Sequence, residues 1–322
     1  MANIVILGVK VLYTSGGQEI LVRDLQRELK NRGHKVELVE IPYAPLPKEG
    51  ILTQAAYWRS IDFNGSSKTD LLIATKFPNY FAKHIPKSVW LVHQHRNIYD
   101  LFGTRFSDFS DDPRDEELRK SIQRADQKCL AEADYLSGIS GNVVERLKQY
   151  NNLDADILYP PLPQGDNYRQ EKSEDYILSV GRLCGIKRVD MMIKALPIVH
   201  KHIKLKIVGT PDEPSIMDYF QNEISKHHLE DRIEFLGRVS NEDLIDLFAK
   251  ARAVYYAPYQ EDYGYVTLEA MASAKPVIAA KDSGGVLEFV RHEENGLVVD
   301  PNSDSVGPVS YTHLTLPTTP YV

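Results

Sequence analysis

The sequence predicts an α/β protein with two Rossmann-like lobes, each built on a parallel sheet. Short apolar runs such as residues 4–8 (IVILG) are continuous rather than alternating, which is typical of strands that helices cover on both faces. These runs alternate with helical stretches, the pattern of a parallel sheet. The alternation stops at the proline-rich residues 159–175 and then restarts. We therefore expect two lobes that face each other across a cleft, where small ligands usually bind.

The first lobe is expected to span residues 1–160. Leucines recur at every fourth position of residues 21–29 and predict a helix over 18–31, which Gly33 ends. Ser140 is placed to cap a later helix. The further strands and helices that the pattern predicts in this lobe lie at 34–40, 71–75, 89–93, 116–133 and 140–150.

Residues 161–175 are expected to link the lobes, and residues 176–305 to form the second one. An amphipathic pattern at 241–251 predicts one of its helices. Its predicted strands lie at 176–180, 204–208, 233–236, 253–257, 276–280 and 296–299.

The end of the chain breaks this pattern. Residues 308–322 are dominated by Thr and Pro and show neither the helical nor the strand period. One interpretation is a flexible tail. The interpretation that we favour is a non-native tail, because the segment resembles translated adaptor or vector sequence. The natural chain would then be interrupted near Ser305.

Composition limits the function classes. The 322-residue chain has a net charge of −7 and a pI near 5.8, so it lacks the overall basic character of a nucleic-acid-binding protein. Cys129 and Cys184 lie far apart and provide no disulfide framework, which fits a reducing compartment. No signal-peptide features occur, and no apolar run approaches the roughly 20 residues that span a bilayer. We therefore expect a cytoplasmic protein without a nucleic-acid partner, and peripheral contact with the inner membrane face stays open.

A basic turn opens the second lobe. The predicted strand at 176–180 is followed by Arg182, Lys187 and Arg188 before the next helix. Cations and backbone N–H groups at a strand-to-helix turn form an anion site, because a helix N-terminus carries partial positive charge. The alternative is a solvated basic loop without a ligand. Cys184 lies among these cations, either as a thiol of lowered pKa or as a small filler.

An acidic loop lies farther along, in the stretch EDYGYVTLEA. Glu261 follows a predicted strand, at the usual ligand side of an open α/β sheet. A helix is expected to begin near Tyr265, so that the N–H groups of residues 265–267 are available to a phosphate. Glu269 leans back toward Glu261, because helical side chains tilt toward the N-terminus. Two carboxylates suit sugar hydroxyls; alternatively, Glu261 is solvated and Glu269 is a surface acid.

Several motifs follow one another in a recognisable order. The first lobe contributes SGG before a helix, RGHKVELVE, VHQHRNIYDLFG and ISGNVVERL. The second contributes ILSVGRL, KRVD, IEFLGRVSNEDL, YYAPYQEDYGYVTLEAMA, KPVIAA, SGGVLEFV and ENGLVV. Over roughly residues 3–300 the chain resembles the retaining glycosyltransferases of family 4, which have the GT-B fold, and the block at 256–299 is the most specific part. The resemblance implies transfer of a hexose from a nucleotide diphosphate sugar to a glycan, a lipid-linked sugar or a small metabolite.

The resemblance also assigns roles in the second lobe. Arg182 and Lys187 match the pair that holds the donor diphosphate. Glu261 matches a glutamate near the transferred sugar, and Glu269 one at the nucleoside ribose. The residues that match backbone donors to the phosphates and the sugar are Tyr265, Val266 and Thr267.

In the first lobe, Gly16 and Gly17 match a loop near the diphosphate and the acceptor. His93 matches a histidine that faces the donor sugar, and His95 competes for that assignment. The family analogy implies neither a metal nor another cofactor, and it leaves GDP, UDP and ADP open as the donor nucleotide. One departure is Ala274, which stands where the family usually has glycine. Another is that the family normally continues past residue 300 with further helices.

Three other functions stay open. A hydrolase would use Glu261 and Glu269 as its acid and nucleophile but would leave the basic turn without a role. A sugar-nucleotide epimerase on the same scaffold would convert the donor with no acceptor present. A truncated, inactive fragment would bind a nucleotide sugar without turnover. A dinucleotide dehydrogenase is disfavoured, because neither lobe has G-x-G-x-x-G in its first turn.

Overall fold

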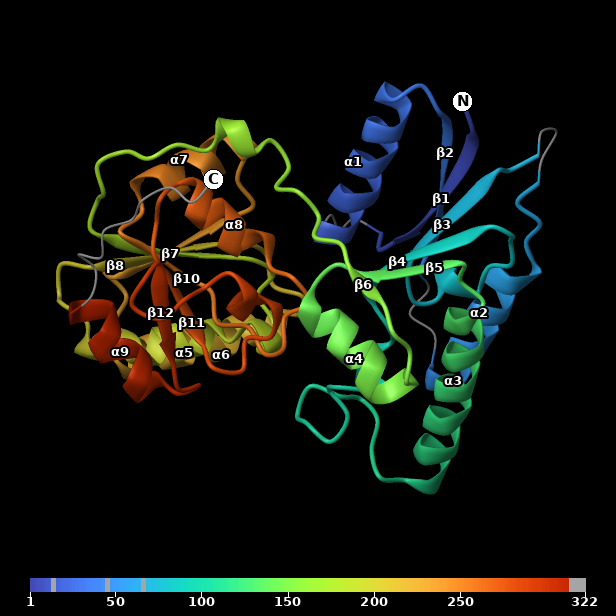
Figure 1. Cartoon of the computed structure of the whole chain (residues 1–322). Coiled ribbons are helices and arrows are strands. Elements are labelled where there is room, and N and C mark those ends of the chain that lie inside the picture. Colours follow the sequence, from blue (N-terminus) through green and yellow to red (C-terminus); the bar gives the residue numbers. More distant parts are fainter. Residues whose placement is uncertain (13–15, 44–46, 65–67, 313–322) are drawn as a thin grey trace. The chain divides into compact units, whose positions relative to one another are not determined.

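The structure, a computed structural model, describes residues 1–12, 16–43, 47–64 and 68–312. The chain divides into two compact units, Met1–Pro163 and Gln164–Val322. Each unit contains one sheet and the helices that pack on it (Figure 1). Ser15 of the glycine loop and residues 313–322 of the expected tail lie outside the described residues. Among the described residues, no helix combines the length and the apolar character needed to cross a bilayer.

The first unit contains a six-stranded parallel sheet of order β2-β1-β3-β4-β5-β6. Its strands are β1 (Asn3–Lys10), β2 (Lys35–Pro42), β3 (Leu71–Lys76), β4 (Lys87–His93), β5 (Tyr135–Gly138) and β6 (Asp156–Ile157). Its α-helices are α1 (Gly17–Asn31), α2 (Ile51–Ser60), α3 (Pro113–Ala131) and α4 (Gly141–Asn151).

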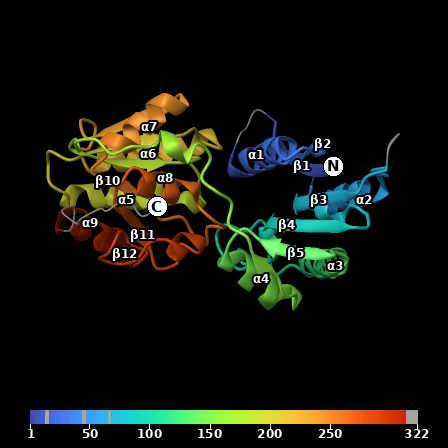
Figure 2. The same ribbon diagram turned by 45° about the horizontal axis from the view of Figure 1, so that its top comes forward.

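The helices cover both faces of this sheet. Figure 2 shows α1 on one face and α3 and α4 on the other. Val22 of α1 packs in the cluster of Ile4, Ile6 and Ile73. Leu25 and Leu29 of the predicted leucine pattern pack against this cluster and are partly buried. Ser140 caps α4 as expected, since its hydroxyl accepts the Val143 N–H at 3.1 Å.

The second unit contains a parallel sheet of order β12-β11-β10-β7-β8-β9. Its strands are β7 (Tyr176–Val180), β8 (Lys204–Val208), β9 (Ile233–Gly237), β10 (Ala253–Tyr255), β11 (Val277–Ala280) and β12 (Gly296–Val299). Its α-helices are α5 (Val189–Ala195), α6 (Pro214–Lys226), α7 (Asn241–Lys250), α8 (Tyr265–Ala272) and α9 (Ser303–Thr312).

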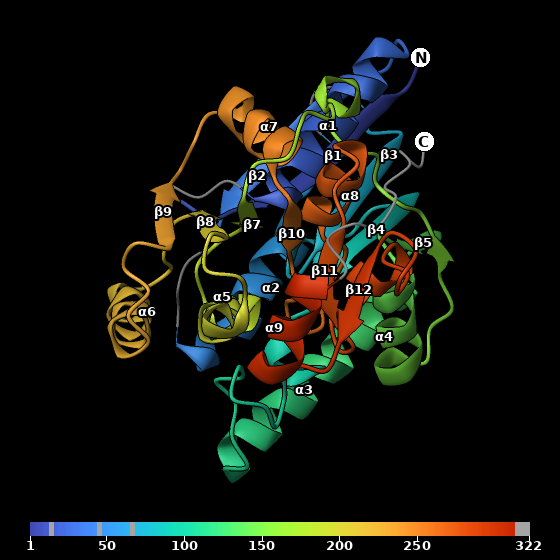
Figure 3. The same ribbon diagram turned by 90° about the vertical axis from the view of Figure 1, so that its left-hand side faces the viewer.

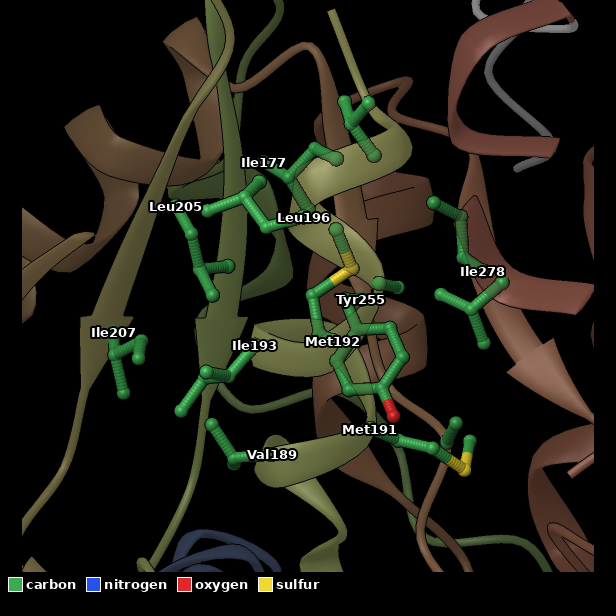
Figure 4. Close-up of a cluster of buried hydrophobic side chains, with 14 of the residues drawn as sticks. Ile177, Val189, Met191, Met192, Ile193, Leu196, Leu205, Ile207, Tyr255 and Ile278 are labelled. Atoms are coloured by element: carbon green, nitrogen blue, oxygen red, sulfur yellow. The ribbon is translucent and has the colours of Figure 1, made fainter. Parts of the chain in front are cut away.

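Residues that alternate along the strands of this sheet belong to two separate hydrophobic cores, one on each face. Figure 3 shows α5, α6 and α9 on one face of the sheet and α7 and α8 on the other. On the first face, Ile177, Leu205 and Tyr255 pack against Met192 and Ile193 of α5 (Figure 4). The other face buries a second set of strand residues with those of α7 and α8: Leu178, Val254, Val277, Phe248 and Ala270. Burial on both faces explains why these strands are continuous apolar runs.

The expected linker is largely part of the second unit. The Glu171 N–H donates to the Ala249 carbonyl at 3.0 Å, and the Glu174 N–H donates to the Lys250 carbonyl at 2.8 Å. The buried Lys275 ammonium bonds the Glu171 carbonyl at 3.2 Å. We call residues 168–175 the strap, because these bonds fasten them over the end of α7.

The last described helix, α9, extends into the first residues of the expected tail at 308–322. Asn302 accepts the Ser305 N–H at 2.8 Å and starts α9, whose Val306 is buried in the core. The prediction that regular structure has ended by residue 308 is wrong for residues 308–312, which continue α9. A helix that has already begun extends more readily than a new one forms, so weak local patterning is sufficient.

Ala274 has a backbone conformation that favours glycine. It has φ of 51°, in the left-handed region. Its N–H donates to the Met271 carbonyl at 2.9 Å, and the Lys275 N–H donates to the Ala270 carbonyl at 2.8 Å. This pair of bonds closes α8 with a Schellman motif, in which the left-handed residue is usually glycine. A side chain in this conformation costs about 1–2 kcal/mol.

We therefore expect Ala274→Gly to stabilise the protein. The relief of strain exceeds the added flexibility of the unfolded chain, so the free energy of unfolding should rise by up to about 1 kcal/mol. Ala272→Gly, inside the same helix, is the matched control and should lower it by roughly 0.5–1 kcal/mol. Urea denaturation measures both, and equal losses in the two variants would contradict the strain at Ala274.

Candidate functional site

The carboxyl ends of β7, β10 and β11, which are neighbours in the second sheet, bring most of the candidate residues together. The turn after β7 contains a short 3-10 helix, η5 (Gly185–Lys187), and leads into α5. The loop after β10 leads into α8. Because parallel strands end at the same edge, the basic turn and the acidic loop lie side by side, and the Tyr259 N–H donates to the Ile186 carbonyl at 2.9 Å.

Arg188 fastens these turns to one another. Its guanidinium donates to the Ala257 carbonyl at 2.8 Å and to the Pro258 carbonyl at 2.9 Å. It also pairs with Asp282, in the turn after β11, at 2.6 Å. Its side chain is 7% exposed, and these partners compensate for the burial of its charge. The structure thus differs from the sequence prediction of an anion-binding role, because the Arg188 guanidinium is committed to the protein itself.

Lys187, the preceding residue, contacts Glu261 directly. Its Nζ lies 2.5 Å from Glu261 Oε2 and 3.1 Å from the Tyr256 hydroxyl. The Lys187 and Glu261 side chains are 16% and 20% exposed. Burial opposes the ammonium charge, but Glu261 and Tyr256 outweigh it and raise the pKa of Lys187 above its ordinary value. Two residues separated by more than seventy positions therefore form one hydrogen-bonded cluster.

Tyr256 connects this cluster to the N-terminus of α8. Gly264, the N-cap of α8, has φ of 87°, and a Cβ there would lie 2.9 Å from Tyr256 Cε1. Glycine is needed both for the left-handed backbone and for the close approach. Thr267, in the first turn, is 0% exposed, and its hydroxyl hydrogen-bonds no described residue. Its amide already donates to the Gly264 carbonyl at 3.0 Å, so this N–H is not among the available donors that were expected.

Glu269 is a half-buried carboxylate rather than a fully solvated helix-surface acid. Burial raises its pKa to about 7. The Tyr168 phenol donates to Glu269 Oε1 at 3.1 Å, which opposes this rise. Burial raises the pKa of Tyr256, and the charges of both Glu261 and Glu269 add to this effect. The charges of both glutamates therefore act on the same tyrosine.

Arg182 lies in the same turn but has a different partner. Its exposed guanidinium pairs with Asp212 at 2.7 Å. Of the two interpretations of Cys184, the lowered-pKa thiol is not supported, because burial raises the pKa of Cys184 more than Arg182 and Lys187 lower it. Cys184 is therefore a partly buried filler.

In the first unit, Gly16 is the N-cap of α1 and Gly17 is its first residue. The Gly16 N–H donates to Glu19 Oε2 at 2.9 Å. Its backbone is extended, and a Cβ would meet only that oxygen, at 3.5 Å. The fold of this unit therefore does not require glycine at position 16.

The two histidines of the first unit differ in their surroundings. His93 ends β4, and its Nδ1 lies 2.7 Å from the Gln94 carbonyl. The His95 ring packs against Phe77, with centroids 5.2 Å apart, and burial lowers the pKa of His95. His95 thus packs in an aromatic cluster, whereas His93 lies at the end of β4.

A buried polar chain supports the loop after β4. Gln94 donates to Asn151 of α4 at 2.7 Å, Asn151 donates to the Tyr99 hydroxyl at 3.4 Å, and Tyr99 donates to Asp126 of α3 at 2.8 Å. Burial raises the pKa of Asp126 to about 7. Sequence reasoning missed this chain, because its members are scattered over more than fifty residues with no spacing signal.

Comparisons with known proteins relate the chain to glycosyltransferases. Residues 165–306, nearly all of the second unit, match the family model described as Glycosyl transferases group 1. An uncharacterised glycosyltransferase of Methanocaldococcus jannaschii is 25% identical over 90% of the chain and 83% of its own length. The D-inositol 3-phosphate glycosyltransferase of Corynebacterium glutamicum is 25% identical over 94% of the chain and 80% of its own length.

Solved structures extend the likeness to the fold. Sucrose-phosphate synthase of Thermosynechococcus elongatus has a TM-score of 0.77 at 17% identity and covers 98% of this chain and 92% of its own. Anabaena HepE, in complex with UDP and glucose, has a TM-score of 0.72 at 18% identity over 98% and 90%. At these identities the matches show the fold, which is GT-B. The predicted fold class, α/β with two parallel-sheet lobes of GT-B type, is confirmed.

The Lys187–Glu261 pair predicts a measurable coupling. Lys187→Met and Glu261→Gln are each expected to lower the free energy of unfolding by about 1–3 kcal/mol, because the remaining polar group is left partly buried without its partner. In the double variant the losses should not add, with a coupling of about 0.5–3 kcal/mol by urea denaturation. The exposed pair Lys281–Asp300 is the control, with coupling below about 1 kcal/mol. Additive losses at 187 and 261 would disprove a direct interaction.

Proposed function

We propose that the protein is a retaining glycosyltransferase of family 4 that transfers a hexose from a nucleotide diphosphate sugar to a hydroxyl acceptor. The observation that carries the proposal is the contact of Lys187 with Glu261 and Tyr256 beside the N-terminus of α8. Cationic and acidic groups at one sheet edge suit a ligand with an anionic part and a hydroxyl-rich part. A nucleotide sugar has both.

The diphosphate is assigned to the basic turn. Arg182 and Lys187 provide positive charge, and the N-terminus of α8 provides N–H groups through Tyr265 and Val266. The buried Thr267 hydroxyl, which lacks a described partner, suits an oxygen of the ligand. In the ligand-free protein both cations already contact carboxylates, so the diphosphate would share or displace the contacts of Lys187 with Glu261 and of Arg182 with Asp212.

The sugars are assigned to the glutamates. Glu261 would accept hydrogen bonds from the transferred hexose, and Glu269 from the nucleoside ribose. Each bond to a charged carboxylate contributes about 1.5–3 kcal/mol. Gly16 and Gly17 would let the diphosphate and acceptor approach the first unit closely, and His93 would face the donor sugar. For Gly16 the room around its Cα supports this assignment, since among the described residues a Cβ there would meet only Glu19 Oε2, at 3.5 Å.

The reaction forms a bond between the acceptor oxygen and the anomeric carbon and breaks the bond from that carbon to the diphosphate. The acceptor proton passes to a leaving phosphate oxygen on the same face of the sugar, so configuration is retained and no strong protein base is needed. Arg182 and Lys187 act by stabilising the negative charge that grows on the leaving diphosphate.

The acceptor is proposed only as a class: a glycan, a lipid-linked sugar or a small metabolite. Two relatives that cover most of the chain are named for small acceptors, D-inositol 3-phosphate and L-malate. UDP is the first nucleotide to test, because HepE was solved with UDP-glucose, but GDP and ADP belong in the same series. Thermal shift with the three diphosphates ranks them by mass action. We place the reaction in the cytoplasm, where peripheral contact with the inner membrane face would suit a lipid-linked acceptor.

Arg182→Ala and Glu261→Ala are each expected to reduce turnover by about 10²–10³-fold, since each removes charge stabilisation or sugar contact in the transition state. The assay is release of nucleoside diphosphate from the donor that binds best, with circular dichroism to show that the fold persists. Arg291→Ala, at an exposed pair with Glu294, is the control and should keep full activity. Activity near wild type in either site variant would overturn its assignment.

The same assay separates the other functions. A hydrolase would cleave nitrophenyl glycosides without any nucleotide. An epimerase would convert the donor sugar with no acceptor and no diphosphate release. Binding of nucleotide with neither product would identify an inactive fragment. Any of these outcomes would contradict the transferase proposal.

We also propose that transfer needs no metal ion, because Arg182 and Lys187 supply the positive charge that a metal would provide. Turnover in excess EDTA should therefore equal turnover with Mg²⁺ or Mn²⁺. A large loss on chelation, restored by a divalent cation, would contradict this proposal while leaving the sugar assignments in place.

A further inference from the structure

Tyr168 makes a contact that the proposed roles leave unexplained. It belongs to the strap, yet its hydroxyl reaches across 101 positions of sequence to Glu269 Oε1, at 3.1 Å. Its ring lies edge-on to Phe248 of α7, with centroids 6.0 Å apart, which fixes the direction of the phenol. The hydroxyl is therefore aimed at one oxygen of the carboxylate, and the other oxygen is left for a ligand.

The strap does not need this bond to stay in place. Glu171 and Glu174 hydrogen-bond the end of α7 through their N–H groups, and Lys275 bonds the Glu171 carbonyl and the Ser173 hydroxyl. Arg169 also pairs with Asp246 of α7. With so many other anchors, the Tyr168 hydroxyl contributes to Glu269 rather than to the attachment of the strap.

Glu269 depends on such a partner. In the part of the chain that the structure describes, Tyr168 is the hydrogen-bond donor found on this carboxylate, and no cation pairs with it. Burial raises the pKa of Glu269 to about 7, and the phenol opposes the rise. The titratable groups that face it are Tyr168 from the strap and Tyr256 from the end of β10, and burial raises the pKa of both phenols. Both therefore stay neutral where Glu269 titrates.

We infer that Tyr168 is a positioning residue for the donor: its phenol holds the Glu269 carboxylate in the orientation and the charged form that accept hydrogen bonds from the ribose diol. The inference rests on the proposed function, in which Glu269 binds the ribose. A protonated carboxyl has lost half of its acceptor capacity, so preference for ribose would fall as pH drops through the pKa of Glu269. Tyr168 would set the pH at which this happens.

The test compares two ligands across pH. Calorimetric Kd values are measured between pH 5.5 and 8.5 for the nucleoside diphosphate that binds best and for its 2′,3′-dideoxy analogue. Diphosphate ionisation affects both ligands alike, so the ratio of their Kd values reports the ribose contacts alone. In the wild type the ratio should be about tenfold or more at pH 8 and fall toward one at pH 5.5.

Tyr168→Phe keeps the ring and removes the hydroxyl. The pKa of Glu269 should then rise, so the ratio should fall severalfold at pH 7 and its midpoint should move to higher pH. Tyr176→Phe is the matched control, because the Tyr176 hydroxyl is also partly buried but bonds the Leu247 carbonyl. It should leave the wild-type profile unchanged. Melting temperatures check that both variants are folded.

Glu269→Gln distinguishes the two ways of failing. If it leaves the ribose preference intact, Glu269 does not bind ribose, and the assignment in the proposed function fails. If it removes the preference while Tyr168→Phe keeps the wild-type pH profile, the function stands and the role of Tyr168 is refuted. A shifted profile in Tyr168→Phe and not in Tyr176→Phe supports the inference.

Discussion

The buried guanidinium of Arg188 is the constraint on which the candidate site depends. It joins the turn after β7, the loop after β10 and the turn after β11 through two carbonyls and Asp282. Its φ of 51° directs the chain so that Arg188 points inward while Lys187 remains beside Glu261. A buried charge is tolerated only when such partners surround it. The burial of Arg188 therefore requires all three turns to be in place.

Before any ligand binds, most of the polar side chains of the site already contact one another or a neighbouring protein group. Lys187 contacts Glu261, Arg182 contacts Asp212, and Glu269 contacts Tyr168. These four side chains assigned to a ligand are thus already bonded to protein groups of complementary character, whereas the Thr267 hydroxyl has no described partner. A ligand with only one kind of charge would break such contacts without replacing them. A molecule that offers both anionic oxygens and hydroxyl donors can satisfy both members of each pair, which favours a nucleotide sugar over a simple phosphate.

The sequence predicted the sheets well because burial on both faces leaves a direct signature. β7, β8 and β12 have the predicted bounds, whereas β5 and β6 were missed because they are short and begin at exposed residues. In the site, charge and position indicated Lys187, Glu261 and Glu269, but not which of two adjacent cations turns inward. That choice depends on the left-handed backbone of Arg188 and on Asp282, which lies 94 positions away. Tyr168 had no local signal at all.

Two polar side chains of helix α8, those of Thr267 and Glu269, are better explained by a ligand than by the stability of the fold. The helix buries the Thr267 hydroxyl without a described partner, and it half-buries Glu269, with which no cation among the described residues pairs. Each of these groups destabilises the free protein, because a polar group loses water on burial and regains only part of its hydrogen bonding. Apolar residues of similar size would give a more stable helix. A ligand that bonds both groups would offset this cost when it binds.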